Sequence, residues 1–289
     1  MSQTKISIPQ DGYPGQPIIG ILQRTADSSK LAASSGSSAG RDRKIALIIH
    51  GVLAHKDQIY HKRLANALAD RGLDSFRYDL RGQGGESEGA WGMMNIDDDV
   101  RDLQRVIEYL GQEGYRIHLL VAHSRGSLLS TYYLSCFDHP HVLFVNLSGR
   151  YDMTKILRDQ RYVDLRRGNE YIEGKTIQWK TRVAGADLER PIDAAGLRSF
   201  AEWDNAYLQS SFDQSIHVLT VHGTADKIVP VQDAHTYHRI LSQRSPGTHT
   251  LSLVEGAGHN FVKPFDEPVK SILRWLDIVD RGRPSGGKL

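Results

Sequence analysis

The feature that most constrains the fold is a regular order of apolar, strand-length runs and amphipathic stretches with helical spacing. The first run, 44–50, reads Lys-Ile-Ala-Leu-Ile-Ile-His, which is typical of a strand covered on both faces. Helical spacing follows over 57–71, a second strand-like run covers 73–80, and an apolar helical stripe falls within 97–111. Strands that alternate with helices predict right-handed βαβ units and a mainly parallel sheet, and so an α/β fold.

The same order continues along the chain with one interruption. Further strands are expected at 117–122, 142–146, 216–221 and 248–254, and further helices at 127–136, 231–243 and 265–280. An antiparallel pair is expected to open the fold, and the Ser- and Gly-rich stretch 26–40 is expected to be a flexible surface loop. Between 153 and 213 the strand signal disappears, and the segment is charged and rich in aromatic residues. We therefore expect a core of residues 1–152 and 214–289, with 153–213 as a helical cap insertion.

The charge balance gives no support for a nucleic-acid-binding protein that relies on a basic face. The 289 residues include 36 Lys and Arg against 34 Asp and Glu, a formal net charge of +2. No apolar run approaches the roughly 18 residues that a membrane helix needs. The first residues lack an apolar stretch, so we expect no secretory signal and a cytoplasmic protein. The final Gly-Lys-Leu is near the peroxisomal address Ser-Lys-Leu, but glycine takes the first position.

The cysteine content and the clusters of acidic and histidine residues give no sign of a metal. Cys136 is the single cysteine, so no intramolecular disulfide can form, and its apolar neighbours predict a buried packing position. Three consecutive aspartates at 97–99 are better explained as helix caps. His235 and His238 lie three apart on a predicted helix, but no third ligand is evident. The glycine-rich stretch from 82 lacks the dinucleotide pattern, and we expect neither metal nor cofactor.

The chemistry is most clearly indicated by Leu-Leu-Val-Ala-His-Ser-Arg-Gly-Ser at 119–127. An apolar strand runs into a turn that carries Ser124, and a helix follows. A serine on such a turn is lifted clear of the sheet, and the turn needs small residues two before and two after it. Gly126 meets this need, and Ala122 replaces the usual first glycine with the next smallest residue.

A serine hydroxyl needs a base before it becomes a good nucleophile, and candidates follow in order. Asp226 lies in the loop after the strand at 216–221, and His259 lies in a glycine-rich loop after the next strand. In this interpretation His259 takes the proton from Ser124, and Asp226 orients the imidazole. Asp152, after the strand at 142–146, is the main rival for the acid.

An oxyanion hole is expected beside the serine. The residue after the nucleophile, Arg125, would supply one backbone N–H, and the loop after the strand at 44–50 would supply another. Val52 is the candidate donor in that loop. His50 is expected to shape the loop by hydrogen bonding, and His123 is expected to be structural.

Four motifs together resemble the α/β-hydrolase superfamily, in particular its group of esterases and serine-aminopeptidase-like proteins that includes cinnamoyl esterases. In chain order they are His50-Gly51 with His55-Lys56-Asp57, Asp79-x-Arg81-Gly82-x-Gly84 with Glu86-Ser87-Glu88-Gly89, the serine turn, and the loops of Asp226 and His259. The departures are Ala122 and an added Gly85. The resemblance implies an eight-stranded, mostly parallel sheet with a cap after the sixth strand.

The expected activity is hydrolysis of carboxylic esters of small or medium-sized molecules through an acyl-enzyme at Ser124. A peptidase or amidase and a thioesterase use the same triad and stay open as alternatives. A ligand-binding protein with this fold and no turnover is a further alternative. The substrate, the cap structure and the oligomeric state are not indicated by the sequence. The aromatic residues of the insertion fit a substrate pocket and a core of the cap equally well.

Overall fold

The computed structural model describes residues 1–10, 12–28, 42–138 and 141–282. Within them an eight-stranded sheet has the order β1-β2-β4-β3-β5-β6-β11-β12. The strands are β1 (Ser2–Ile8), β2 (Ile18–Arg24), β3 (Arg43–Ile49), β4 (Asp74–Tyr78), β5 (Tyr115–His123), β6 (Leu143–Leu147), β11 (His217–Gly223) and β12 (His249–Val254). β1 pairs antiparallel with β2, β2 antiparallel with β4, and the remaining pairs are parallel. The predicted α/β fold is confirmed, whereas most of the 26–40 stretch and the final Gly-Lys-Leu lie outside the described residues.

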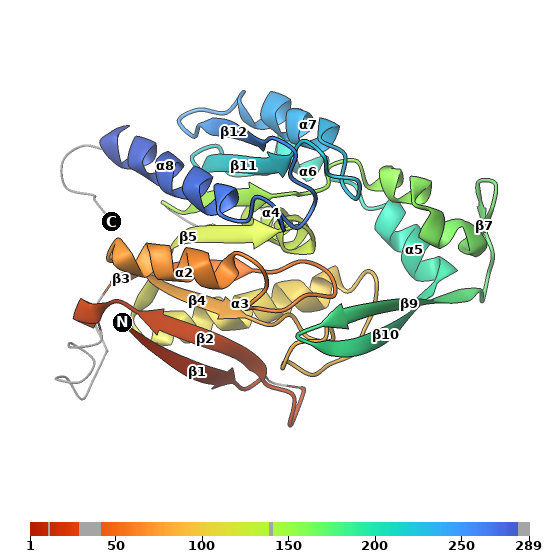
Figure 1. Cartoon of the computed structure of the whole chain (residues 1–289), viewed down its shortest axis with the longest axis horizontal. Coiled ribbons are helices and arrows are strands. Elements are labelled where there is room, and N and C mark those ends of the chain that lie inside the picture. Colours follow the sequence, from red (N-terminus) through yellow and green to blue (C-terminus); the bar gives the residue numbers. More distant parts are fainter. Residues whose placement is uncertain (11, 29–41, 139–140, 283–289) are drawn as a thin grey trace.

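Helices cover both faces of the sheet (Figure 1). They are α2 (His61–Asp70), α3 (Ile96–Gln112), α4 (Arg125–Cys136), α7 (Gln232–Leu241) and α8 (Glu267–Gly282). Ile45, Leu47 and Ile49 of β3 join the apolar cluster with α3, α4 and α7, whereas Ala46 and Ile48 join the cluster with α2 and α8. Alternate side chains of one strand are therefore buried on opposite faces, which is why its sequence is a continuous apolar run. In the described part of the chain, no helix is long and apolar enough to cross a membrane.

Most of the insertion between β6 and β11 lies at one end of the molecule, whereas its last helix packs against α4 and α7 of the core (Figure 1). Its elements are η1 (Met153–Arg158), η2 (Gln160–Leu165), β7 (Arg166–Arg167), β8 (Glu170–Tyr171), β9 (Thr176–Val183), β10 (Ala186–Asp193), α5 (Ala194–Ala201) and α6 (Tyr207–Ser210). The expectation of a purely helical cap is corrected by the β9–β10 hairpin, which pairs all eight residues of each strand. Side chains of β9 alternate between exposed and half-buried, so the strand contains no apolar run to signal it. Ala184 and Gly185, both with positive φ, form the two-residue turn.

A small apolar cluster of its own holds the insertion together. Its members include Ile156, Leu165, Ile192 and Leu197, and Met93 of the core joins them. The cluster packs residues 156–201 together, whereas Met153, Leu208 and Phe212 belong to the larger cluster of the core. The treatment of 153–213 as a separate cap stays a prediction.

Cys136 is exposed, and the prediction of a buried position is wrong. It is the last residue of α4, where the helix leaves the core. Tyr133 and Leu134 on the preceding turn face inward and are buried, so they account for the apolar character of this stretch.

Candidate active site

The turn between β5 and α4 gives Ser124 an unusual backbone conformation. Its φ is 53° and its ψ is −113°, a region that non-glycine residues rarely occupy. The Ser124 N–H donates to the carbonyl of Leu147 on the neighbouring strand at 2.8 Å, which fixes the turn against the sheet. A Cβ on Gly126 would lie 2.7 Å from the carbonyl oxygen of His50, so this position requires glycine. Ala122 is fully buried in β5, so the sheet accommodates the methyl group that replaces the usual glycine.

The structure brings Ser124, Asp226 and His259 together from three strand ends. His259 Nε2 lies 3.0 Å from Ser124 Oγ, and His259 Nδ1 lies 2.8 Å from Asp226 Oδ2. The second carboxylate oxygen of Asp226 accepts the backbone N–H groups of Ile228 and Val229 at 2.8 and 2.9 Å. These bonds fix the carboxylate beside the imidazole, so the three side chains form one hydrogen-bonded chain.

Asp226 is ionised in this arrangement. Burial works to raise the pKa of its carboxyl group, but hydrogen bonds from His222 and His259 and the amide of Val229 outweigh burial, and the pKa lies well below its usual value. The rival acid, Asp152, is far more exposed and caps η1 by accepting the backbone N–H of Thr154. The partner of His259 in the structure is therefore Asp226.

The backbone carbonyl of His259 is held by residues at the ends of β5 and β6. It accepts hydrogen bonds from His123 Nε2 at 2.9 Å and from Ser148 Oγ at 3.1 Å. His123 thus positions the loop that carries the imidazole, which agrees with the structural role expected for it.

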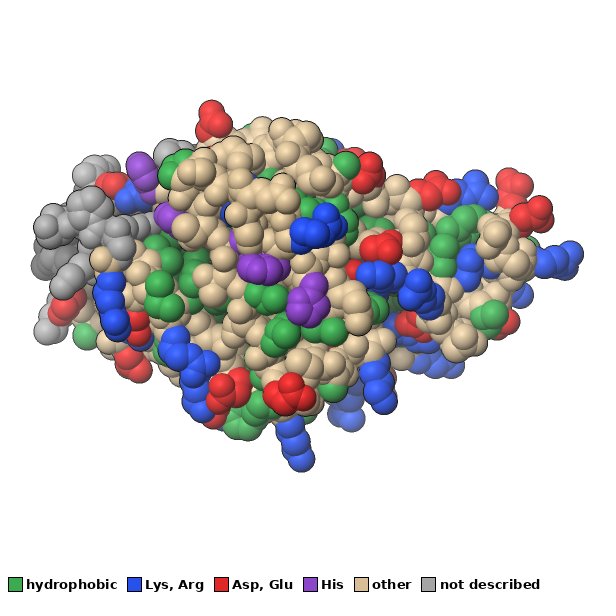
Figure 2. Space-filling model, turned by 90° about the horizontal axis from the view of Figure 1, so that it is seen from above, with side chains coloured by type: hydrophobic (Ala, Val, Ile, Leu, Met, Phe, Trp, Pro, Cys, Tyr) green, Lys and Arg blue, Asp and Glu red, His purple; other side chains and the backbone are tan. Residues whose placement is uncertain are grey.

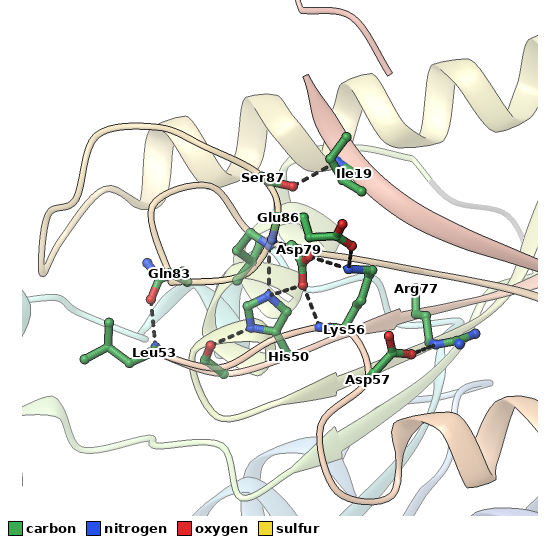
Figure 3. Close-up of polar contacts among 12 residues, drawn as sticks. Ile19, His50, Leu53, Lys56, Asp57, Arg77, Asp79, Gln83, Glu86 and Ser87 are labelled. Carbon is green, nitrogen blue, oxygen red and sulfur yellow. Dashed lines mark hydrogen bonds and ion pairs between the residues drawn. The ribbon is translucent and has the colours of Figure 1, made fainter. Parts of the chain in front are cut away.

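The loop after β3, which carries Val52, is fixed by three contacts (Figure 3). The backbone N–H of Leu53 donates to Gln83 Oε1 at 2.9 Å, and the N–H of Lys56 donates to Asp79 Oδ1 at 2.7 Å. His50 Nε2 accepts the N–H of Leu80 at 2.8 Å. The loop is therefore held by hydrogen bonds at both ends and near its middle. His50 shapes the loop by hydrogen bonding, which agrees with the role expected for it.

Asp79 lies at the centre of the hydrogen bonds that hold this loop. Its carboxylate is fully buried and also binds the Lys56 ammonium at 2.7 Å and the N–H of Glu86 at 2.9 Å. A Cβ on Gly85 would lie 2.3 Å from the Asp79 carboxyl carbon. The added Gly85 thus lets the chain pass close to the buried carboxylate.

Two buried histidines near the serine predict how stability depends on pH. Burial lowers the pKa of His50 to about 4 and that of His123 to about 3, so both are neutral in the folded protein. In the unfolded chain their pKa returns to about 6.5. Below that pH the unfolded state binds protons that the folded state does not, so the free energy of unfolding should fall as the pH is lowered from about 6.5 towards 4.

Urea unfolding across this pH range would measure the dependence. Where a histidine is protonated only in the unfolded chain, lowering the pH by one should cost about 1.4 kcal/mol of the free energy of unfolding. A His123→Gln variant, which has no ionisable group at that position, should show a shallower fall. A flat profile in the unmodified protein would contradict the assignment of neutral, buried histidines.

Ser124 and His259 open into a pocket between the core and the insertion. Its volume is about 990 Å³, including space open to solvent. The lining residues are Gly51, Val52, Leu53, Ala54, Gln58, Met93, His123, Ser124, Arg125, Leu128, Arg150, Met153, Ile156, Arg161, Tyr162, Trp179, Thr181, Phe200, Ile228, Val229, His259 and Asn260. The aromatic residues of the insertion lie both at the pocket and in the insertion's own apolar cluster. Trp179 lines the pocket, and Tyr162 lines it while also packing in that cluster.

Both predicted backbone donors, Val52 and Arg125, line this pocket with the serine. Sequence reasoning missed Gln83, which holds the Val52 loop, and Arg150, which also lines the pocket. Arg150 follows the carboxyl end of β6, the edge of the sheet at which Ser124 lies, and that placement is a signal that could have found it. In the described ranges, no group of three or more His, Cys, Asp or Glu side chains is arranged to hold a metal ion.

Part of the chain resembles a known protein family, and most of it resembles a yeast protein. Residues 40–147 match a family model described as serine aminopeptidase, S33. The uncharacterised protein YDL057W of Saccharomyces cerevisiae is 28% identical over 259 residues, which cover 81% of this chain and 74% of the yeast protein.

Solved structures share the fold at low sequence identity. Est1E from Butyrivibrio proteoclasticus with ferulic acid bound superposes with a TM-score of 0.69 at 15% identity, covering 96% of this chain and 100% of that one. The esterase domain of a Rhodothermus marinus protein gives 0.61 at 16% identity, covering 95% and 98%. With the strand order and the turn at Ser124, these findings show that the chain has the α/β-hydrolase fold, and that residues 40–147 resemble the serine aminopeptidase family.

Proposed function

We propose that the protein is a serine hydrolase that cleaves carboxylic esters through an acyl-enzyme intermediate. The observation that carries the proposal is the hydrogen-bonded chain from Ser124 Oγ to His259 Nε2 at 3.0 Å and from His259 Nδ1 to Asp226 Oδ2 at 2.8 Å. The ferulic acid in the Est1E structure and the esterase domain from Rhodothermus marinus support an ester as the substrate.

In the first half-reaction His259 Nε2 takes the hydroxyl proton while Ser124 Oγ attacks the ester carbonyl. The carbonyl oxygen becomes negatively charged and is stabilised by the backbone N–H groups of Val52 and Arg125, each worth about 3 kcal/mol in the transition state. His259 then gives its proton to the departing alkoxide, and the alcohol leaves. Asp226 stays charged throughout and stabilises the imidazolium.

In the second half-reaction a water molecule enters where the alcohol left. His259 takes its proton, the hydroxide attacks the acyl-enzyme carbonyl, and Ser124 recovers the proton as the carboxylic acid departs. The same backbone donors stabilise the second oxyanion, so one arrangement serves both steps.

Wild-type hydrolysis of p-nitrophenyl acetate, combined with a fluorophosphonate probe, tests the proposal. We expect turnover and a covalent adduct that peptide mass spectrometry locates on Ser124. A folded protein that neither turns over the ester nor forms the adduct would contradict the proposal and favour the non-catalytic, ligand-binding alternative.

A peptidase or amidase is the second candidate, and the serine aminopeptidase family model favours it. Amide hydrolysis uses the same groups but requires His259 to protonate a poorer leaving group. Matched acetyl ester, acetyl thioester and amino-acid p-nitroanilide substrates, assayed side by side, would separate the three activities. The ester hypothesis predicts the largest kcat/KM for the oxygen ester.

Gln83 should act as a positioning residue for the oxyanion hole. Gln83→Met removes the acceptor of the Leu53 N–H while keeping the volume, so the neighbouring Val52 N–H should lose its alignment. We expect kcat for p-nitrophenyl acetate to fall by about 10- to 100-fold with little change in KM, less than full loss of a donor. Gln83→Glu, which keeps an acceptor oxygen, should retain more of the activity. Equal kcat in Gln83→Met and wild type would show that the hydrogen bond from Leu53 to Gln83 is not needed to position the loop.

A further inference from the structure

Three arginines line the pocket that contains Ser124, and they differ in how their charge is balanced. Arg125 forms an ion pair with Asp99 at 2.7 Å. Arg161 binds the carboxylate of Asp159, with Nε 3.0 Å from Oδ2. Arg150 has no carboxylate within ion-pair distance in the described part of the chain.

Arg150 is buried, and one nitrogen of its guanidinium group makes no hydrogen bond to the described residues. The residue is only 7% exposed. Nη2 donates to the carbonyl of Ile228 at 2.6 Å, while Nη1 is buried and has no hydrogen-bond partner among the described residues. A buried charged group without a partner is strongly destabilising, so such a group is rare unless a ligand completes it.

The acidic groups near Arg150 are engaged elsewhere. Burial lowers the pKa of Arg150 despite the opposing influence of Asp233 and Asp226. Asp233 binds the Lys155 ammonium and the N–H of Tyr151, and Asp226 is bound to the imidazole of His259. Arg150 therefore lines the pocket without an ion-pair partner of its own among the described residues.

The position of Arg150 is fixed through its backbone. Its carbonyl accepts the Tyr237 hydroxyl at 3.1 Å and Asn205 Nδ2 at 3.5 Å, and Asn205 also binds the next carbonyl, that of Tyr151, at 2.7 Å. β5 and β6 are hydrogen-bonded neighbours, and Ser124 and Arg150 each follow the end of one of them. The arginine is thus built into the same edge of the sheet as the serine.

We propose that Arg150 binds a carboxylate carried by the substrate, so that the preferred substrates are esters with one free carboxylate. This inference rests on the proposed ester hydrolysis at Ser124. One unpaired guanidinium supplies one positive charge and planar donors, which suit a carboxylate better than a phosphate dianion. Met153 and Ile156 on the same pocket give the rest of the substrate an apolar surface.

Selection by a buried group fits the surface charge of the molecule. Figure 2 shows basic and acidic side chains intermingled on the visible face over the end formed by the insertion, with no field of a single sign. An anionic substrate would therefore be recognised inside the pocket rather than attracted by the surface around it.

Two matched pairs of esters test the proposal. The first pair, p-nitrophenyl hexanoate and mono-p-nitrophenyl adipate, differs by a carboxylate on the acyl side. The second, phenyl acetate and para-acetoxybenzoate, differs by a carboxylate on the alcohol side. We expect wild type to favour the anionic member of at least one pair in kcat/KM, and the pair that shows the preference identifies the side that Arg150 contacts.

Arg150→Met should lower that preference, expressed as the ratio of the two kcat/KM values, by about 10- to 100-fold, chiefly through KM. Arg150→Lys should keep part of it. Arg161→Met is the matched control, because it removes a pocket arginine whose charge Asp159 already balances, and it should leave the ratio nearly unchanged. A lowered ratio would show that Arg150 recognises the carboxylate. If Arg150 acted only by holding the Asp226 loop through its hydrogen bond to the carbonyl of Ile228, the variant would slow both esters equally and leave the ratio unchanged. An unchanged ratio in Arg150→Met, or no preference in wild type, would overturn the proposal while leaving ester hydrolysis intact.

A binding measurement separates this proposal from the proposed catalysis. In a Ser124→Ala background, adipate or benzoate should raise the melting temperature, and the added Arg150→Met change should abolish the rise. If wild type hydrolysed no ester, the ester-hydrolase proposal would fail, but a carboxylate shift lost with Arg150 would still support the binding site. No shift with either carboxylate, together with no substrate preference, would reject the site.

Discussion

Ser124→Ala is expected to lower kcat/KM for p-nitrophenyl acetate by about 10⁴-fold or more. Without Oγ, His259 has no hydroxyl to deprotonate, no acyl-enzyme can form, and only the oxyanion donors and ester binding act on the uncatalysed attack of water. Loss of the hydroxyl removes one hydrogen bond at a half-buried position. The variant should therefore fold, and thermal unfolding checks this.

Ser135→Ala is a suitable control for the assay. It removes a serine from the same helix, α4, whose hydroxyl only donates to the carbonyl of Thr131. This control should hydrolyse the ester at close to the wild-type rate and should still accept the fluorophosphonate label. Undiminished turnover by folded Ser124→Ala would reject the serine mechanism.

Asp226→Asn is expected to lower kcat for the same ester by about 10⁴-fold. The asparagine oxygen can still accept the N–H groups of Ile228 and Val229, so the loop keeps its shape. Its amide then presents N–H groups to His259 Nδ1, which favours the tautomer with the proton on Nε2, facing Ser124. That tautomer cannot accept the serine proton.

A pH–rate profile and a control at the rival acid complete this test. The loss in Asp226→Asn should persist across the neutral range, since the wild-type carboxylate with its lowered pKa is charged throughout it. Asp152→Asn should retain nearly full activity because that side chain caps η1 and makes its hydrogen bonds to Thr154. A large loss in Asp152→Asn with little in Asp226→Asn would reverse the assignment of the acid.

The sheet and the order of the three candidate catalytic residues were predictable from local patterns. Strands such as β3 are buried on both faces, so their apolar runs are continuous, and residues just beyond parallel strands meet at one edge. The chain order of Ser124, Asp226 and His259 then predicted their meeting without any distance. Local sequence carried this information because burial and turn geometry are decided within a few residues of each site.

The insertion and the charge balance of the pocket were not predictable in this way. β9 alternates exposed side chains with half-buried ones up to the buried Val183, so it lacks the continuous apolar run by which the strands of the main sheet were predicted. Whether Arg150 has a carboxylate partner depends on which distant segments pack together, and Asp233 of α7 pairs with Lys155 rather than with Arg150. Such pairing is a property of tertiary contacts, which residue type and spacing do not determine.

The carbonyl of His259 accepts hydrogen bonds from His123 and Ser148, at the ends of β5 and β6. Both of these residues precede the insertion in the chain. The proposed proton acceptor thus takes its position from the strand that carries its own nucleophile and from the adjacent strand, and both precede residues 153–213. We therefore expect that the walls contributed by that insertion can be exchanged without moving the two residues that hold the His259 carbonyl. The carboxylate preference proposed for Arg150 would also stay with the core, because Arg150 precedes Met153, so a graft of another insertion between β6 and β11 should change only the remaining walls of the pocket.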